Sequence, residues 1–299
     1  MTPIQKKQSS LRTYASIKLD QFEKFAARST TINKILKVLY RSVVYRFISK
    51  KLNEFREYKL LEEIKQHPVP HHIAIIMDGN RRFAKSLNLS PETGHLFGRE
   101  KIEEVLEWCF DLDIKILTIY AFSMDNFNRN SKEVRTLMNL FREELEHVKT
   151  DPRVHSNQVR IRVIGHLESL PKDIQKSAYD VMDITKQYSK YSLNLAIAYG
   201  GREEIIQAIQ HIARDVKHNR IRLKDISERK VASYLYTTGL PDPDLILRTS
   251  GEERISNFLL WQLAYSELYF SDVYWPAFQK RDFLQAIRTY QNRQRRFGT

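Results

Sequence analysis

The sequence predicts an α/β protein whose single domain is built on a central, mostly parallel six-stranded sheet flanked by helices. From residue 71 onward, short apolar runs alternate with longer stretches whose apolar residues recur at helical spacing, which is typical of βαβ units. The first apolar run, Ile73 to Met77, has no polar face, as expected of a strand buried on both sides. Only nine Gly and nine Pro occur in 299 residues, which excludes a collagen-like or linker-rich chain.

The expected elements follow one another along the chain. Strands are predicted at His72–Met77, Lys115–Phe122, Val159–Ile164, Leu193–Tyr199, Asp244–Leu247 and Glu267–Phe270. Helical spacing predicts helices over about 94–112, 131–149, 171–189, 202–218, 256–265 and 281–296. Ser131 and Glu133 open the second helix with a polar cap and an acidic first turn. The stretch Asp78-Gly79-Asn80-Arg81-Arg82 is expected to be the loop that leaves the first strand.

The first 66 residues differ in composition from the rest of the chain. They hold 15 Lys and Arg against 6 Asp and Glu, so +9 of the net charge of +13 lies there. Apolar residues recur at helical spacing from Ile32 to Ile48 with basic residues between them, which predicts a basic amphipathic helix. Such a helix can bind a membrane surface or pack on the following domain, and the almost acid-free start also fits a cleaved transit peptide. Pro68 and Pro70 mark the boundary between this extension, 1–66, and a domain over 67–299.

The composition limits the partners and the cellular compartments that the sequence favours. A net charge of +13 fits nucleic acid, an anionic membrane surface or phosphate-bearing substrates as partners. No run of 18 apolar residues predicts a membrane-spanning helix, and no apolar segment near the start predicts a secretory signal. The one cysteine, Cys109, cannot form an internal disulfide, which favours a reducing compartment. Its apolar helical surroundings predict a core position rather than a nucleophile.

Polar side chains follow the carboxyl ends of the first five predicted strands. They are Asp78, Asn80, Arg81 and Arg82; Ser123, Asp125, Asn126 and Arg129; Gly165 and His166; Gly200, Gly201 and Arg202; and the run from Arg248 to Ser256. In a parallel sheet these ends meet at one edge, where α/β proteins bind ligands. A carboxylate there suits Mg²⁺, arginines suit phosphate oxygens, and His95 at a helix start can meet a phosphate. The sequence therefore predicts a basic cleft for phosphate-rich ligands, with turns of merely solvated charges as the alternative.

Several familiar sites are absent from the sequence. It contains no P-loop, no dinucleotide-binding glycine pattern, no zinc-spaced Cys and His cluster and no nucleophile elbow. A nucleic-acid binder is expected to spread its charge over one face with interleaved aromatic residues, whereas most of this excess charge lies in residues 1–66. No nucleic-acid partner is expected.

These motifs together resemble the cis-prenyltransferase family, the undecaprenyl and dehydrodolichyl diphosphate synthases, over about residues 68–298. The resemblance rests on His72–Phe83, Tyr120–Ser123, Asn126–Arg129, Tyr199–Arg202, Asp244–Glu252, Arg254–Gln262 and Glu267–Phe270. It implies the family's fold and its reaction, the condensation of isopentenyl diphosphate onto an allylic diphosphate primer. Farnesyl diphosphate is the expected primer, and a Z-polyprenyl diphosphate is the expected product.

The resemblance also implies roles for individual residues. Asp78, Asn80 and Ser123 are expected to be catalytic; Gly79, Arg81, Arg82 and His95 to bind the allylic diphosphate; and Arg129, Arg248, Arg254 and Ser256 to bind isopentenyl diphosphate. Asp78 and Glu267 are expected to hold Mg²⁺. The growing apolar chain is expected in a tunnel walled by Leu106, Cys109, Leu137, Leu140 and Phe141, for which ordinary core packing is the alternative.

The C-terminal residues Arg295-Arg296-Phe297-Gly298 resemble the Arg-x-Gly end that self-sufficient members insert into a neighbouring subunit's active site. Arg296 and Gly298 are therefore expected to make intersubunit contacts in a homodimer that needs no other subunit. A short-chain Z-prenyl diphosphate synthase and a non-catalytic scaffold subunit are the alternative functions.

Arg81, Phe83 and Phe127 resemble the eukaryotic members, whereas Pro91 and Glu253 stand where bacterial members have Arg and His. The resemblance therefore favours an enzyme of dolichol-type synthesis at the cytoplasmic face of the endoplasmic reticulum, with a plastid as the alternative. The N-terminal helix is expected to provide a peripheral membrane contact.

Overall fold

The computed structural model describes residues 51 and 54–297, with side chains up to residue 293. The chain divides into two compact units, Met1–Leu60 and Leu61–Thr299, and the second contains the whole sheet. The predicted amphipathic helix of residues 32–48 lies outside the described residues, and its role stays a prediction. In the part of the chain that is described, no helix has the length and apolar character to cross a bilayer.

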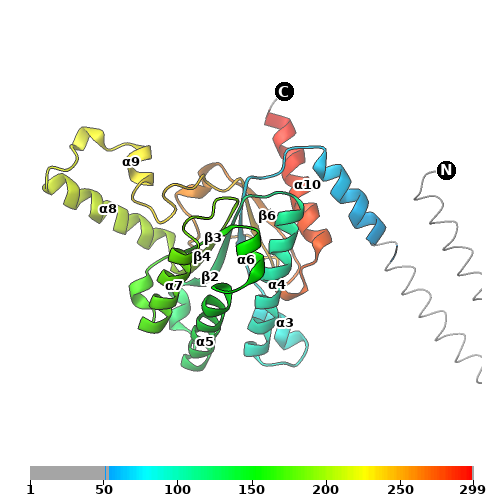
Figure 1. Cartoon of the computed structure of the whole chain (residues 1–299). Helices are drawn as coiled ribbons and strands as arrows, with labels where there is room; N and C mark the ends of the chain where they lie inside the picture. The colour runs from blue at the N-terminus through cyan, green and yellow to red at the C-terminus, as the bar shows by residue number, and fades with distance from the viewer. Residues whose placement is uncertain (1–50, 52–53, 298–299) are drawn as a thin grey trace, which may run out of the picture. The chain divides into compact units, whose positions relative to one another are not determined.

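Six strands form one all-parallel sheet in the order β3–β4–β2–β1–β5–β6 (Figure 1). Their bounds are β1 His72–Ile76, β2 Ile116–Ser123, β3 Val159–Ile164, β4 Tyr191–Tyr199, β5 Leu245–Arg248 and β6 Glu267–Phe270. All six predicted strands are present, and the predicted fold class is confirmed. Every residue of β1 is buried, as its unbroken apolar run predicts.

Helices fill most of the connections between the strands (Figure 1). They are α3 Asn80–Ser86, α4 Pro91–Asp111, α5 Ser131–Val148, α6 Pro152–Ser156, α7 Lys172–Ile184, α8 Gly201–Lys217, α9 Glu228–Ala232 and α10 Lys280–Phe297, with short 3₁₀ turns η1 Met124–Asn128, η2 Leu167–Ser169, η3 Leu223–Asp225, η4 Gln262–Tyr265 and η5 Trp275–Ala277. The prediction that residues 78–82 form only a loop is wrong, because α3 begins at Asn80. Gly79, with φ of 101°, makes the sharp turn between β1 and this helix.

The predicted helix over 256–265 is also wrong. Ser256, Asn257 and Leu259 have φ of 47°, 63° and 47°, which breaks a right-handed helix, and only η4 remains of it. The Asn257 carbonyl accepts from the Gly201 amide at 2.7 Å, and its side-chain oxygen accepts from the Arg202 amide at 2.9 Å. The segment thus caps the start of α8 instead of bonding to itself.

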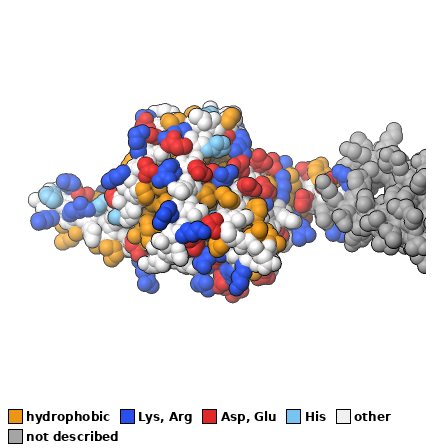
Figure 2. Space-filling view, turned by 90° about the horizontal axis from the view of Figure 1, so that it is seen from below, with side chains coloured by type: hydrophobic (Ala, Val, Ile, Leu, Met, Phe, Trp, Pro, Cys, Tyr) orange, Lys and Arg blue, Asp and Glu red, His pale blue; other side chains and the backbone are white. Residues whose placement is uncertain are grey.

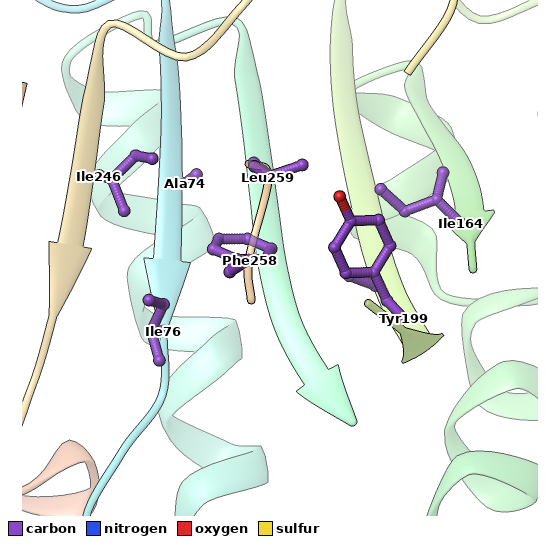
Figure 3. Close-up of a cluster of buried hydrophobic side chains, with 8 residues drawn as sticks. Ala74, Ile76, Ile164, Tyr199, Ile246, Phe258 and Leu259 are labelled. Carbon is purple, nitrogen blue, oxygen red and sulfur yellow. The ribbon is translucent and has the colours of Figure 1, made fainter. Parts of the chain in front are cut away.

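This irregular segment helps to build the core next to the carboxyl ends of the strands. Phe258 and Leu259 are fully buried and pack with Ala74, Ile76 and Ile246 and with further residues of β3 and β4 (Figure 3). The Tyr120 ring stacks on Phe258 with ring centroids 4.5 Å apart. The loop between β5 and β6 is therefore held firmly against the sheet at the edge where the predicted site lies.

The chain just before β1 is tied to the C-terminal helix. Gln291 of α10 is buried and donates to the carbonyls of Ile64, His67 and Pro68 at 2.9–3.2 Å. Ile64 itself is fully buried. The domain therefore includes residues that precede the prolines at 68 and 70.

Candidate active site

The loop after β1 is fixed by the loop after β5. The Asp78 amide donates to Thr249 Oγ1 at 2.9 Å, and the Thr249 hydroxyl donates to the Asp78 carbonyl at 2.7 Å. A side chain at Gly79 would place its Cβ 2.8 Å from Tyr274 Cδ1 and 2.9 Å from Ser250 Cβ. The close approach of these loops explains why only glycine fits there, and it sets the direction of the Asp78 carboxylate.

Two arginines hold the Asp78 carboxylate. Arg248 Nη2 donates to Oδ2 at 2.7 Å, and Arg82 Nη2 donates to Oδ1 at 3.2 Å. Burial would raise the pKa of Asp78, but the hydrogen bonds and charges of Arg248 and Arg82 outweigh it and lower that pKa. Asp78 is therefore an ionised carboxylate inside a pair of cations, which we call the arginine cage.

Each arginine of the cage has further partners. Arg248, only 4% exposed, also donates to Ser256 Oγ at 2.8 Å and to the Arg254 carbonyl. Arg82, which is more exposed, donates to Glu252 Oε1 at 2.9 Å and to the Ser250 hydroxyl. Both arginines are thus held from several sides, and Arg82 is the more exposed of the two.

A second cluster of charges centres on Glu133, which is 8% exposed. Its Oε1 accepts from Arg129 Nη1 at 2.9 Å and lies 3.3 Å from His95 Nε2 and 3.9 Å from Arg81 Nε. Burial lowers the pKa of His95 and outweighs the hydrogen bond to Glu133, which raises it. Glu133 thus positions three of the predicted phosphate-binding side chains.

This role of Glu133 is not predicted by any of the sequence motifs. The spacing of Arg129 and Glu133, four residues apart at a helix start, is the signal that points to it. Its contact with His95 joins α5 to α4 and follows from tertiary structure alone.

Ser123 stands at the end of β2 and caps η1. Its hydroxyl accepts from the Asn126 amide at 3.2 Å, and its own amide donates to Asn126 Oδ1 at 3.1 Å. The cap fixes the backbone, and the Ser123 hydroxyl also hydrogen-bonds the Tyr120 side chain. Ser123 is therefore held at the rim in a defined position.

These residues line one open cleft. It brings together the predicted site residues Asp78, Gly79, Asn80, Arg81, Arg82, His95, Ser123, Arg129, Arg248 and Ser256. The Arg254 side chain is not part of the lining and pairs with Glu252 at 2.5 Å. In the view from below (Figure 2), Lys and Arg side chains lie interspersed with acidic and hydrophobic ones rather than forming one continuous basic surface.

Glu267 does not lie near Asp78 within one chain, and its predicted role as a magnesium ligand stays a prediction. Glu267 pairs in register with Leu245, and Leu245 with Ile73, so Glu267 lies near the amino end of the sheet. Asp78 follows the other end of β1, about 16 Å further along the strand direction. Glu267 is instead paired with Arg293 at 2.8 Å. The predicted intersubunit residues, Arg296 by its side chain and Gly298 entirely, lie outside the described residues.

A second, largely apolar cavity leads away from the cleft between α4 and α5. The two cavities share Met77, Asn80, His95, Ala121 and Leu137, so they meet at the carboxyl ends of β1 and β2. Leu106, Leu137, Leu140 and Phe141 line this tunnel as predicted. Cys109 does not, because it is buried in the core as its apolar surroundings indicate.

Asn80 stands at the junction of cleft and tunnel. Its side-chain oxygen is buried without a hydrogen-bond partner, and a Cβ on Gly98 would lie 2.4 Å from it. A buried, unpartnered acceptor is uncommon in folded proteins and marks a place where a ligand can supply a donor.

Among the cleft's carboxylates, Asp78 is the one that lies beside the two arginines of the cage. Among residues 51 and 54–297, no three His, Cys, Asp or Glu side chains gather into a metal site. Mg²⁺ commonly binds one or two protein carboxylates together with substrate phosphates. Asp78, beside arginines that suit phosphate, therefore fits a magnesium ion shared with a bound diphosphate.

Comparison with known proteins agrees with this geometry. A family model described as putative undecaprenyl diphosphate synthase matches residues 76–298. A Thermoplasma acidophilum protein named tritrans,polycis-undecaprenyl-diphosphate synthase (geranylgeranyl-diphosphate specific) is 54% identical over 242 residues, which is 81% of this chain and 94% of that protein. A Thermococcus kodakarensis protein of the same name is 50% identical over 263 residues, 87% of this chain and all of that protein.

Solved structures show the same likeness. The lavandulyl diphosphate synthase of Lavandula x intermedia, in complex with dimethylallyl diphosphate, is 38% identical with a TM-score of 0.71 and covers 75% of this chain and 95% of its own. A probable undecaprenyl diphosphate synthase from Campylobacter jejuni is 33% identical, with a TM-score of 0.62. The match covers 78% of this chain and 100% of the Campylobacter chain.

Proposed function

Because this chain belongs to the undecaprenyl diphosphate synthase family, and is therefore a cis-prenyltransferase, we propose that it adds isopentenyl diphosphate to an allylic diphosphate primer. The observation that carries this proposal is the junction of the arginine cage with the apolar tunnel. A substrate with an anionic head and a hydrocarbon tail fits a basic cleft that opens into such a tunnel. Asp78, Asn80 and Arg82 at this junction argue against a non-catalytic scaffold.

The allylic diphosphate is proposed to lie against the start of α3. Arg82 turns from Asp78 toward its oxygens, with the Gly79 backbone, Arg81 and His95 beside it. The carbon–oxygen bond of the primer breaks as its diphosphate leaves with the bonding electrons. The positive charge of the arginines stabilises the negative charge of the departing diphosphate.

Magnesium is the proposed cofactor, and Asp78 is the residue that would hold it. When bound, the ion neutralises charge on the departing diphosphate. The same carboxylate keeps Arg248 in place for the second substrate, so Asp78 serves both halves of the site.

Isopentenyl diphosphate is proposed to bind at the loop after β5, through Arg248 and Ser256, with Arg129 on the same cleft. The predicted contact with Arg254, whose side chain pairs with Glu252, stays a prediction. The double bond of isopentenyl diphosphate then lies against the allylic carbon, which is the alignment that the new carbon–carbon bond requires. As the bond forms, the isopentenyl unit loses a proton to the released diphosphate. Asn80 and Ser123 orient this unit.

For the primer we propose geranylgeranyl diphosphate ahead of the farnesyl diphosphate expected from the sequence. The Thermoplasma and Thermococcus relatives both carry the words geranylgeranyl-diphosphate specific in their names. A polyprenyl lipid carrier is the proposed use of the product, and its conversion to dolichol stays a prediction. The kinship with eukaryotic members also stays a prediction.

A homodimer is proposed as the working form. The α8–α9 arm projects from the sheet (Figure 1) and exposes Ile206 by 55%, Ile209 by 53% and Leu223 by 74%. Large apolar side chains grouped on one projecting element favour a protein interface. The homodimer expected from the C-terminal motif would cover them.

We propose that the protein is located at the cytoplasmic face of the endoplasmic reticulum, with a plastid as the alternative. The charge of +9 in residues 1–66 supports a peripheral contact with an anionic membrane surface.

The proposal is tested by supplying the purified full chain with Mg²⁺, labelled isopentenyl diphosphate and either primer. We expect label to enter polyprenyl products, with a higher kcat/KM for geranylgeranyl than for farnesyl diphosphate. The reverse preference would contradict the primer proposal alone. A folded chain that incorporates no label with either primer would overturn the proposed reaction.

A further inference from the structure

Tyr274 lies against the first turn of the candidate active site. Its ring approaches the Gly79 backbone so closely that a Cβ on Gly79 would lie 2.8 Å from Tyr274 Cδ1. The guanidinium carbon of Arg82 lies 5.8 Å from the centroid of the same ring. Tyr274 is half-buried and is not among the described residues that line the cleft. It can therefore act on a bound substrate only through the residues that it contacts.

The backbone on both sides of Tyr274 is fixed to the two loops of the site. The Val273 carbonyl accepts from an amide of the loop after β5 at 2.8 Å, and the Trp275 amide donates to the Asp78 carbonyl at 3.0 Å. The Trp275 indole is fully buried and donates to the Gly98 carbonyl of α4 at 2.7 Å. The base of the Tyr274 side chain is therefore held by the same loops that carry the site residues.

The Tyr274 ring offers Arg82 a contact of a different kind from its other partners. The hydrogen bonds of Arg82 go to Asp78, Glu252 and Ser250, which are acceptors in fixed directions. A bound diphosphate would compete with these acceptors for the same N–H groups. The face of an aromatic ring attracts a guanidinium without binding one particular N–H. Contact with Tyr274 can therefore persist while the hydrogen bonds of Arg82 are exchanged.

We propose that Tyr274 is a positioning residue for the allylic diphosphate, because it holds the guanidinium of Arg82. The inference rests on the proposed function, since it takes Arg82 as a ligand of the primer. The ring limits the orientations of an arginine side chain that is 42% exposed and has many rotamers. Less rotamer freedom is then lost when the diphosphate binds, so the primer binds more tightly. Isopentenyl diphosphate, whose proposed ligands are Arg248 and Ser256, gains nothing from the ring.

The test measures primer binding in the full-length wild type, Y274L and Y274F. Calorimetric titration with geranylgeranyl diphosphate and Mg²⁺, without isopentenyl diphosphate, gives the Kd in the absence of turnover. We expect Y274L, which loses the ring, to bind the primer about two- to tenfold more weakly, as expected for the loss of one cation–aromatic contact. Y274F keeps the ring and should bind as the wild type does. If Y274L is unstable, Y274M serves in its place with the same expected loss.

A second measurement separates this role from a merely structural one. The KM for isopentenyl diphosphate, at saturating primer, is expected to be the same in Y274L and the wild type. R82A should weaken primer binding by itself, and R82A/Y274L should weaken it no further, because the ring then has no guanidinium to hold. The matched control is Y191L, which removes another ring beneath a cation, with Lys115 Nζ 5.1 Å from its centroid, at the start of β4. Y191L should leave the Kd of the primer unchanged.

Equal primer affinity in the wild type and in folded Y274L would overturn the inference and leave the proposed reaction standing. Additive losses in R82A/Y274L would also overturn it, as would equal losses for the two substrates, which indicate a general disturbance of the site. A wild type that incorporates no label in the assay of the proposed function would instead refute that function, and with it a role for Tyr274 in the reaction.

Discussion

At the scale of single residues, Asp78 has a structural task besides its proposed catalytic one. Its carboxylate neutralises Arg248, which is almost fully buried and whose Nε has no partner of its own. A variant that removes the carboxylate altogether therefore disturbs folding as well as chemistry. An amide in its place keeps the shape and leaves an oxygen to accept one hydrogen bond.

We predict that Asp78→Asn abolishes turnover and leaves thermal unfolding close to that of the wild type. Asp78→Ala is expected to lose turnover too, but with the free energy of unfolding reduced by about 3 kcal/mol, because Arg248 stays buried without its counter-charge. Urea titrations and product assays on both variants measure this. An alanine variant as stable as the asparagine one would show that the cage does not support the fold.

Burial of His72 makes the stability of the fold depend on pH. Burial lowers the pKa of His72 from 6.5 to about 4, although the Pro241 carbonyl that the ring contacts raises it. The unfolded chain takes up this proton first as the pH falls, so stability is fully present above pH 6.5 and is lost toward pH 4.

We expect this one residue to reduce the free energy of unfolding by about 3 kcal/mol over that range. Urea titrations between pH 6.5 and 4 on the wild type and on His72→Gln measure the effect. The variant should show a flatter dependence on pH. Equal slopes in the two proteins would mean that another group is responsible.

At the scale of elements, the contact between α3 and α4 depends on two glycines one helical turn apart. A Cβ on Gly94 would lie 2.2 Å from the Asn80 carbonyl oxygen, and one on Gly98 would lie 2.4 Å from Asn80 Oδ1. The first clash is with backbone, which must shift, and the second is with a side chain, which can turn.

We predict that Gly94→Ala destabilises the fold by about 1–3 kcal/mol. Gly98→Ala should leave stability nearly unchanged and reduce turnover by moving Asn80. In an unconstrained helix, alanine in place of glycine would instead raise the free energy of unfolding by about 1 kcal/mol. Neither variant is expected to show that gain. Thermal melts and initial rates separate the two effects, and a fully active Gly98→Ala enzyme would contradict a role for the Asn80 side chain.

The same scale shows where sequence patterns predict elements and where they fail. The six strands follow from apolar runs, because both faces of a central parallel strand are buried. The pattern of residues 256–265 is equally apolar, yet Phe258 and Leu259 point into the core from a backbone with positive φ. The spacing of apolar residues indicates which side chains are buried. It does not distinguish a helix from a loop that is hydrogen-bonded to the start of α8.

At the scale of the whole molecule, the exposed apolar residues of the α8–α9 arm predict association. We expect the wild-type chain to have the mass of a dimer by light scattering, and Ile206→Glu with Ile209→Glu to reduce it to that of a monomer. Ile184→Glu, at an exposed apolar position on α7, is the matched control and should leave the mass unchanged. A monomeric wild type that is fully active would contradict the proposed dimer.

Most of the cleft could be predicted from the sequence, because polar residues after parallel strands gather at one edge of the sheet. The partners within it could not. That Glu133 holds His95, and that Arg248 and Arg82 share Asp78, depends on how α4, α5 and the loop after β5 are packed. The position of Glu267 could not be predicted either. Its family motif implies a place in the site, but within one chain Glu267 lies at the opposite end of the sheet from the cleft.

Prenyl transfer by this chain alone, at the Asp78 cage, is the proposal on which all the others depend. A single-turnover assay with excess enzyme, Mg²⁺, labelled isopentenyl diphosphate and geranylgeranyl diphosphate tests it most directly. We predict a one-unit-extended product from the wild type and none from equally folded Asp78→Asn. Product formation by the asparagine variant at the wild-type rate, or none by the wild type, would contradict the account.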